Sequence, residues 1–262
     1  MQFIFLIKST LFALLSLSLC FTSYTQPVNI GLLNRQALEY KRNFKDTLAI
    51  ETFKKVLKLD PNNVTALHNT AYLLCNLAGR SNNYNDKRHH LNLAVSLSKQ
   101  AVIIEPNNIE ANITYTIAVA MITEIAHSPK EKLANVRLIK EQAEKIIKLA
   151  PNRPEGYFIL GKWHAGIAAL NSMEVVAANI LYGGVPTDAT FDDAIKYIQT
   201  AIRIHPEYIL FQYNLAVTYM QMGEKSKATQ VLQDTLQLRP LEPDDYIRLQ
   251  MARELLRDLN KG

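Results

Sequence analysis

Five prolines recur along this sequence of 262 residues, and their spacing constrains the fold more than any other feature. They are Pro61, Pro106, Pro151, Pro206 and Pro240, with successive intervals of 45, 45, 55 and 34 residues. Proline has no amide hydrogen with which to continue a helix, so each is expected to end one. The shortest interval predicts a repeating unit of about 34 residues. The longer intervals predict the same unit with insertions of 11, 11 and 21 residues.

The stretch 209–240 shows one unit without an insertion. Leu215 and Ala216 belong to the apolar face of a first helix, and Gly223 ends it, where a left-handed residue is tolerated. Ala228 returns to the same side in a second helix, so small residues lie where the two helices approach. This helix–turn–helix unit resembles the tetratricopeptide repeat. Because one unit cannot bury its own apolar face, several in register predict a solenoid.

The sequence therefore predicts an all-α fold: a tetratricopeptide-type α-solenoid of five helix pairs plus a C-terminal capping helix, with a helical insertion in the fourth pair. Within a repeat domain of residues 26–262, the predicted units are about 30–63, 64–108, 109–153, 154–208 and 209–242, and the cap is 243–260.

Two stretches are predicted to be the longer insertions. SNNYNDKRHH is expected to lengthen the second unit as a polar insertion, and the apolar VVAANILYGG is expected to pack against its neighbours in the fourth. Gly183, Gly184 and Pro186 are expected to turn the chain. Thr190 with Asp193 is expected to cap the next helix.

Residues 1–25 have the pattern of an export signal. Lys8 precedes an apolar run and a short polar stretch, and cleavage is expected after Thr25. Two alternatives are an uncleaved membrane anchor over residues 3–21 and a lipoprotein modified at Cys20. The mature protein is expected to be periplasmic or secreted, with no membrane span after signal cleavage.

Composition and motifs argue against several function classes. The net charge is only +5 and there is no Lys/Arg block, so nucleic acid is not expected as a partner. Cys75 is alone in the mature chain and is expected to be a small core residue. The adjacent His89 and His90 cannot hold one metal from one helix face. No Ser-His-Asp set, paired carboxylates, Gly-rich phosphate loop or HExxH motif is present, so we predict no catalytic residue, no metal and no cofactor.

Residues 105–258 carry a narrower resemblance, most specific over Leu160–Ala201. The segment begins with L-G-x-W, continues through an insertion ending in Y-G-x-x-P, and resumes with A-T-F-x-D-A-I. It is similar to the regulator of microtubule dynamics family of tetratricopeptide proteins. The resemblance implies the repeat fold with its unusual insertion, and an association with microtubules and mitochondrial contact sites. It also implies phospholipid binding, which is associated with the repeat domain of one relative.

In such a solenoid the first helix of each pair lines the concave face. The residues predicted to line this groove, as candidates for contact with a partner or lipid, are His68, Tyr72, Asn76, Ile113, Ile117, Met121, Phe158, Lys162, Tyr213, Val217 and Met220. Three interpretations stay open: the insertion or the superhelix covers them, they bind an apolar peptide or helix of an unknown protein partner, or they bind a lipid acyl chain with Lys162 near its head group. The predicted function is an exported, non-catalytic scaffold for protein–protein interaction; the alternative is a module that binds or transfers phospholipid or another hydrophobic ligand.

Overall fold

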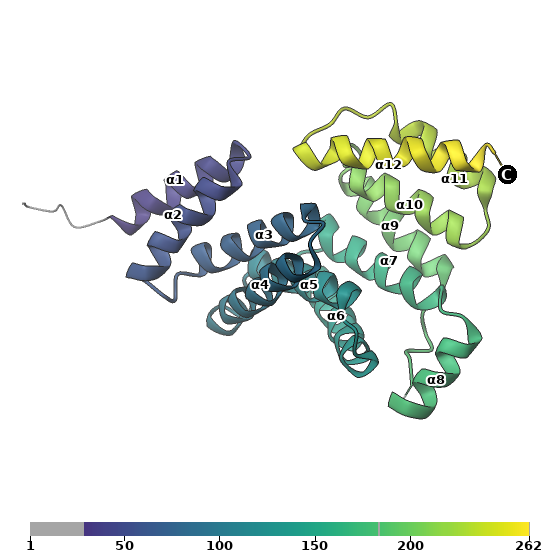
Figure 1. Cartoon of the computed structure of the whole chain (residues 1–262), viewed down its shortest axis with the longest axis horizontal. Coiled ribbons are helices and arrows are strands. Elements are labelled where there is room, and N and C mark those ends of the chain that lie inside the picture. The colour runs from purple at the N-terminus through teal and green to yellow at the C-terminus, as the bar shows by residue number, and fades with distance from the viewer. Residues whose placement is uncertain (1–28, 183, 262) are drawn as a thin grey trace, which may run out of the picture.

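The computed structural model describes residues 29–182 and 184–261, which form twelve α-helices and no strand. The predicted export signal lies outside the described residues, as does Gly183 of the predicted turn. Figure 1 shows the helices as a curved stack with α1 and α2 at one end and α12 at the other. The helices are α1 (Ile30–Arg42), α2 (Asp46–Leu59), α3 (Val64–Arg80), α4 (Tyr84–Ile104), α5 (Ile109–Ile125), α6 (Pro129–Leu149), α7 (Pro154–Ala168), α8 (Ser172–Tyr182), α9 (Phe191–Ile204), α10 (Ile209–Gln221), α11 (Lys225–Thr235) and α12 (Pro243–Leu259).

The helices pack in five pairs, which confirms the predicted all-α solenoid. The pairs are α1 with α2, α3 with α4, α5 with α6, α7 with α9, and α10 with α11, and each pair also packs on the next. α12 packs against α10 and α11 in the place predicted for a cap. The apolar face that one pair leaves open is thus covered by its neighbour, as the repeat pattern requires.

The prolines mark the ends of four second helices. α2, α4, α6 and α9 each end two residues before a proline. At the first two junctions an asparagine then starts the next helix, because Asn63 and Asn108 accept hydrogen bonds from the backbone N–H three residues on, at 3.1 and 3.0 Å. The fifth proline differs from the prediction: α11 already ends at Thr235, and Pro240 lies in the connection to α12.

The extra residues of the second unit, predicted as a polar insertion, are helical and lengthen α4. Asn83 caps α4 by accepting hydrogen bonds from the N–H groups of Asn85 and Asp86, at 2.9 and 3.1 Å. Residues 84–90 therefore form the first turns of a helix of 21 residues. The stretch contains no glycine or proline after its cap, so its polarity did not prevent helix formation.

The fourth unit contains the predicted helical insertion, α8, but this helix is not packed as predicted. Met173, Val176 and Ile180 lie along one side of α8 and are 82%, 54% and 76% exposed. Figure 1 shows α8 at the periphery of the stack. Its packing neighbour is α6, and these three apolar side chains extend into solvent.

By contrast, α7 and α9 on either side of the insertion pack closely. A Cβ atom added to Gly161 on α7 would lie 2.6 Å from Ile198 Cγ1 and 3.0 Å from the carbonyl oxygen of Ala194, both on α9. Glycine is therefore required there for the two helices to touch. Trp163 Nε1 also donates to the carbonyl oxygen of Val136 on α6, at 2.8 Å.

The predicted cap of α9 is confirmed and is tied to α7. Thr190 Oγ1 accepts a hydrogen bond from the N–H of Asp193 at 3.0 Å. The Thr190 N–H in turn donates to Nδ1 of the buried His164 at 3.3 Å, which also stacks on Tyr197. These bonds and the Gly161 contact join α7, which carries the L-G-x-W segment, to the A-T-F-x-D-A-I segment at the start of α9.

Candidate functional site

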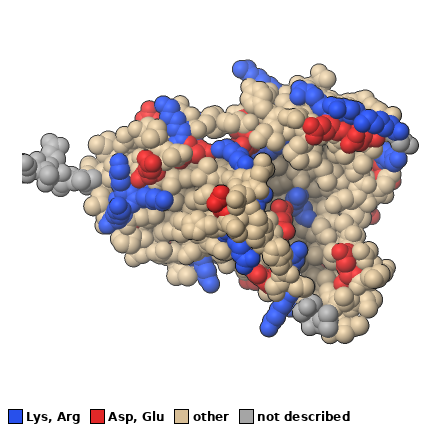
Figure 2. Space-filling view, viewed as in Figure 1, with Lys and Arg blue, Asp and Glu red and all other residues tan. Residues whose placement is uncertain are grey.

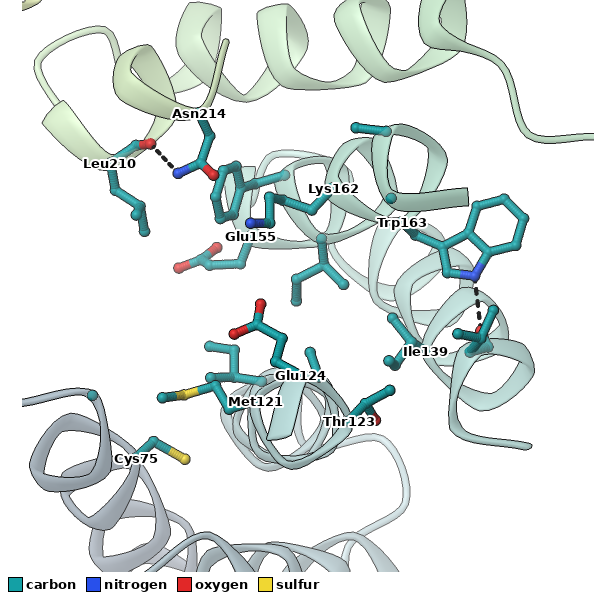
Figure 3. Close-up of a pocket in the computed structure, with 18 of the residues that line it drawn as sticks. Cys75, Met121, Thr123, Glu124, Ile139, Glu155, Lys162, Trp163, Leu210 and Asn214 are labelled. Carbon is teal, nitrogen blue, oxygen red and sulfur yellow. Dashed lines mark hydrogen bonds between the residues drawn. The ribbon is translucent and has the colours of Figure 1, made fainter. Parts of the chain in front are cut away.

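The concave side of the solenoid encloses a cavity of about 1220 Å³. Its walls come from the first helices α3, α5, α7 and α10, with further residues from α6, α8 and the start of α12. Figure 2 shows this face hollowed between the N-terminal and C-terminal helices, with charged side chains at the edge. Figure 3 shows side chains from these helices converging on the hollow.

Most of the groove residues predicted from the sequence line this one cavity. They are His68, Tyr72, Asn76, Ile113, Ile117, Met121, Phe158, Lys162 and Val217. They come from units two to five, so the repeat register correctly placed residues separated by as many as 149 positions on one surface.

Tyr213 and Met220 do not line the cavity, which corrects two of the predicted positions. Tyr213 packs into the cluster formed with α11 and α12, and Met220 packs with Leu215 and Ala228. The side of α10 that faces the cavity instead carries Leu210, Asn214, Val217 and Gln221. The cap and α11 pack against the other side of α10, where Tyr213 and Met220 are partly buried outside the groove.

Sequence reasoning also missed an apolar wall from a second helix. Leu133, Val136 and Ile139 of α6 line the cavity although they belong to the helix expected to face outward. They are spaced three residues apart on an amphipathic helix, but this pattern alone does not say whether the covered face meets another helix or a cavity.

A polar cluster lies at the N-terminal end of the cavity. Lys41 Nζ donates to Asn69 Oδ1 at 2.6 Å and lies 4.5 Å from the centre of the Tyr72 ring. Burial lowers the pKa of Lys41. Burial, followed by the charge of Lys41, lowers the pKa of His68 to about 4, so this imidazole is neutral at pH 7. This end of the cavity thus offers the half-buried ammonium of Lys41, the neutral imidazole of His68 and the carboxylate of Glu110.

Charged side chains also project into the middle of the cavity. Figure 3 shows Glu124, Glu155 and Lys162 directed into the same space. Glu155 is held by Arg153, whose Nη2 and Nε donate to its two carboxylate oxygens at 2.7 and 3.0 Å. Within residues 29–182 and 184–261, the Lys162 ammonium has no ion-pair or hydrogen-bond partner and is available to a ligand.

A third polar group lies where the cap begins. The Tyr208 hydroxyl donates to Glu242 Oε1 at 3.1 Å, and Arg248 Nη1 donates to Glu242 and to Asp245 Oδ1, the latter at 2.8 Å. Burial, then the charge of Glu242, raises the pKa of Tyr72 on α3 to about 12. Tyr72 of the second unit and Glu242 at the start of the cap thus line the same cavity.

Arg80 connects those two regions directly. Its Nη1 donates to Asp46 Oδ2 at 2.6 Å, and its Nε and Nη2 donate to the two oxygens of Asp244 at 2.6 and 3.2 Å. The bonds to Asp244 and Asp46 raise the pKa of Arg80. Nothing in the sequence pointed to this contact, because its two carboxylates lie 34 and 164 residues away.

The groups considered for chemistry occupy structural places in the described part of the chain. Cys75 is 2% exposed, and burial raises the pKa of its thiol to about 12, so it is not a thiolate at neutral pH. The ring of His164 caps the start of α9 through Thr190. Among the described residues no three His, Cys, Asp or Glu side chains gather as a metal site would need. A search of the same residues finds no helix with the length and apolar character of a membrane span.

Stacked helical hairpins, a concave cavity and a terminal capping helix together define a tetratricopeptide-type solenoid. Solved structures agree: a thermophilic tetratricopeptide protein of Thermus thermophilus superposes with a TM-score of 0.64 at 15% identity, covering 86% of this chain and 100% of that one. A tetratricopeptide repeat protein of Parabacteroides merdae superposes with a TM-score of 0.56 at 14% identity, covering 90% and 76%.

The sequence matches the family model described as regulator of microtubule dynamics protein 1-3 over residues 33–260, so the chain belongs to this family. It is 26% identical to human regulator of microtubule dynamics protein 2 over 166 residues, which are 63% of this chain and 40% of that protein. Identity to the rat protein 1 is 26% over 55% of this chain and 46% of that protein. The chain thus spans less than half of the length of these curated relatives.

Proposed function

We propose that this protein is a non-catalytic scaffold that binds an apolar segment of a partner protein in its concave cavity. One observation carries the proposal: successive first helices contribute apolar side chains to one continuous surface. Ile113, Ile117 and Met121 of α5 lie between Tyr72 of α3 and Phe158 of α7 on that surface. A groove of this kind suits an extended or helical segment whose apolar residues follow a regular spacing.

The polar groups beside the apolar surface support a peptide over a purely apolar ligand. Lys41 with Asn69, and Glu242 with Arg248, provide donors and acceptors that could fix the direction of a peptide. Pockets in proteins usually combine an apolar surface with a few such polar groups, and the polar groups provide specificity.

The proposal can be tested by selecting binders from a displayed library of random peptides. We expect the protein to enrich apolar peptides, and we expect Ile117→Asp to lose them because a carboxylate in the cavity is not compatible with an apolar ligand. Ile180→Asp is the matched control, since Ile180 is 76% exposed on α8 outside the cavity.

Circular dichroism and thermal unfolding establish that the variants are folded, and Val217→Asp replaces Ile117→Asp if that variant is not. Two results contradict the proposal: no peptide enriched over the bare matrix, or equal enrichment by the wild type and a folded cavity variant.

A second candidate function is binding of a phospholipid or another hydrophobic ligand. The cavity favours it, because about 1220 Å³ exceeds the roughly 300–1,000 Å³ typical of pockets for small ligands. Native mass spectrometry of the purified protein with lipid extraction separates the two candidates. Stoichiometric phospholipid would replace the scaffold proposal by the lipid one.

We also propose that the protein is exported and that residues 1–25 are removed. The support is the sequence pattern of a charged residue, an apolar run and a polar stretch. N-terminal sequencing of the protein expressed in its own host tests this: the chain should begin at Gln26, and retention of Met1 would contradict signal cleavage.

A further inference from the structure

The stack is curved so far that its second unit meets its cap, and Arg80 makes the connection. Arg80 is the last residue of α3, Asp46 is the first residue of α2, and Asp244 is in the first turn of α12. One guanidinium therefore joins the first two units to a helix that begins 163 residues after it. The fork of N–H donors on Arg80 matches the two oxygens of Asp244, a geometry that strengthens a charged hydrogen bond.

The connection lies at the edge of the cavity. Asp244 itself lines the cavity, as does Gly79, the neighbour of Arg80. The closely packed neighbours of α12 are α10 and α11, and those of α3 are α2, α4 and α5. In the described part of the chain, the hydrogen bonds that cross the cavity edge between α3 and α12 are those of Arg80 with Asp244.

The start of α12 is firmly attached on its other side. Glu242 accepts from Tyr208 at 3.1 Å, and Asp245, which is fully buried, accepts from the N–H of Leu241 at 3.0 Å. The cap is therefore fixed to the fifth unit, whereas its hydrogen bonds to the second unit, among the described residues, come from Arg80. Separation of the bridge would move the cap and fifth unit together away from the first two units.

We propose that the Arg80–Asp244 bridge is a clasp that holds the curved stack closed and controls access of the ligand to the cavity. The inference rests on the proposed function, in which the cavity is the binding site. The side chains of Arg80 and Asp244 are 33% and 21% exposed, so water and salt reach the pair. Pairs of this kind are individually weak and are screened as salt rises, which makes the clasp easy to open.

Asp46 provides a matched control for Asp244. Both are aspartates in the first turn of a helix, and both bond to the same guanidinium. Asp244→Asn weakens the link across the cavity edge and leaves the contact between α2 and α3. Asp46→Asn does the reverse, so general loss of an ion pair or of a helix-terminal charge affects both variants alike.

The opening can be measured in the full chain by single-molecule energy transfer between dyes on Glu51→Cys and Gln250→Cys, both exposed sites on α2 and α12. Cys20→Ser removes the other thiol that could react, and Cys75 is buried. Binding is followed in parallel with Nile red, a neutral apolar dye, by stopped-flow fluorescence.

We expect Asp244→Asn to shift the population towards longer distances and to raise the association rate of Nile red about threefold to tenfold. Wild type in 1 M NaCl should change in the same direction relative to 0.05 M NaCl, and Asp46→Asn should behave like wild type. Unchanged distances in Asp244→Asn would overturn the clasp, as would equal shifts in both variants.

The remaining outcomes are separable. Changed distances with an unchanged Nile red rate would show that the bridge closes the stack without controlling access, which overturns the gating role. Failure of Nile red to bind any variant would overturn the proposed apolar site, while the distances would still show whether the bridge closes the stack.

Discussion

The fourth unit contains two surfaces that are similarly apolar in sequence, but one is buried in the structure and the other is exposed. The interface between α7 and α9 is tightly packed around Gly161 and Ile198, whereas α8, inserted between them in the sequence, exposes Met173 and Ile180. The two helices of a repeat can thus pack closely at a small residue such as Gly161, even when a long insertion separates them in the sequence. Lengthening a connection costs little, because loop-closure entropy grows slowly with length.

The largest difference in stability between the two surfaces is expected for a pair of isoleucines in this unit. Ile198 on α9 is fully buried and Ile180 on α8 is 76% exposed. We expect Ile198→Ala to lower the free energy of unfolding by about 2–5 kcal/mol, since it leaves a cavity in a packed interface. Ile180→Ala should change it by less than about 0.5 kcal/mol. Urea unfolding measures both, and similar losses for the two variants would mean that α8 is part of the core.

Two glycines of α7 allow a packed position and an open position to be compared within one helix. Gly161→Ala should destabilise by about 1–3 kcal/mol, because the added Cβ would overlap Ile198 and the backbone of α9. A Cβ added at Gly166 meets nothing within 4 Å, so Gly166→Ala should stabilise by about 0.5–1 kcal/mol through helix propensity. Thermal unfolding of the two variants gives the signs. Stabilisation by Gly161→Ala would disprove the close approach.

The two helix caps should give the smallest difference. Thr190→Ala removes the cap of α9 and should cost about 1 kcal/mol of global stability. Asn171 accepts from the Glu174 N–H at 3.0 Å at the start of α8, and Asn171→Ala should change global stability by less than about 0.5 kcal/mol.

Hydrogen exchange reports the local consequence. Asn171→Ala is expected to speed amide exchange in α8 while exchange in α7 and α9 stays as in wild type, because the peripheral helix can open by itself. Faster exchange in all three helices would contradict the independence of α8.

Most of the groove residues that the repeat register predicted line the cavity, and the two that do not have a physical explanation. Ile117, Phe158 and Val217 were placed correctly because equivalent positions of successive first helices face the same side of a solenoid. Tyr213 and Met220 were misplaced because α12 and α11 bury their side of α10, and a cap follows no repeat pattern.

The apolar or polar composition of a segment predicted its burial and conformation less well than the repeat register predicted the groove. The apolar residues of α8 predicted burial, but burial needs a partner surface, and α8 leaves Val176 54% exposed. The polar stretch SNNYNDKRHH predicted an insertion but not its conformation, and after the Asn83 cap it forms the first turns of α4. The hydrogen bonds of Arg80 could not be predicted from the sequence, since they depend on the curvature of the whole stack.

The exposed apolar side of α8 is the main alternative binding surface to the cavity. Our central proposal is that the ligand binds inside the cavity. Methyl NMR spectra recorded while a selected apolar peptide is added compare the two directly. We predict shifts for the isoleucine methyls of the cavity, which are Ile113, Ile117, Ile139, Ile159 and Ile167, and none for the exposed Ile103, Ile180 and Ile247. Shifts at Ile180 with unchanged cavity methyls would contradict it.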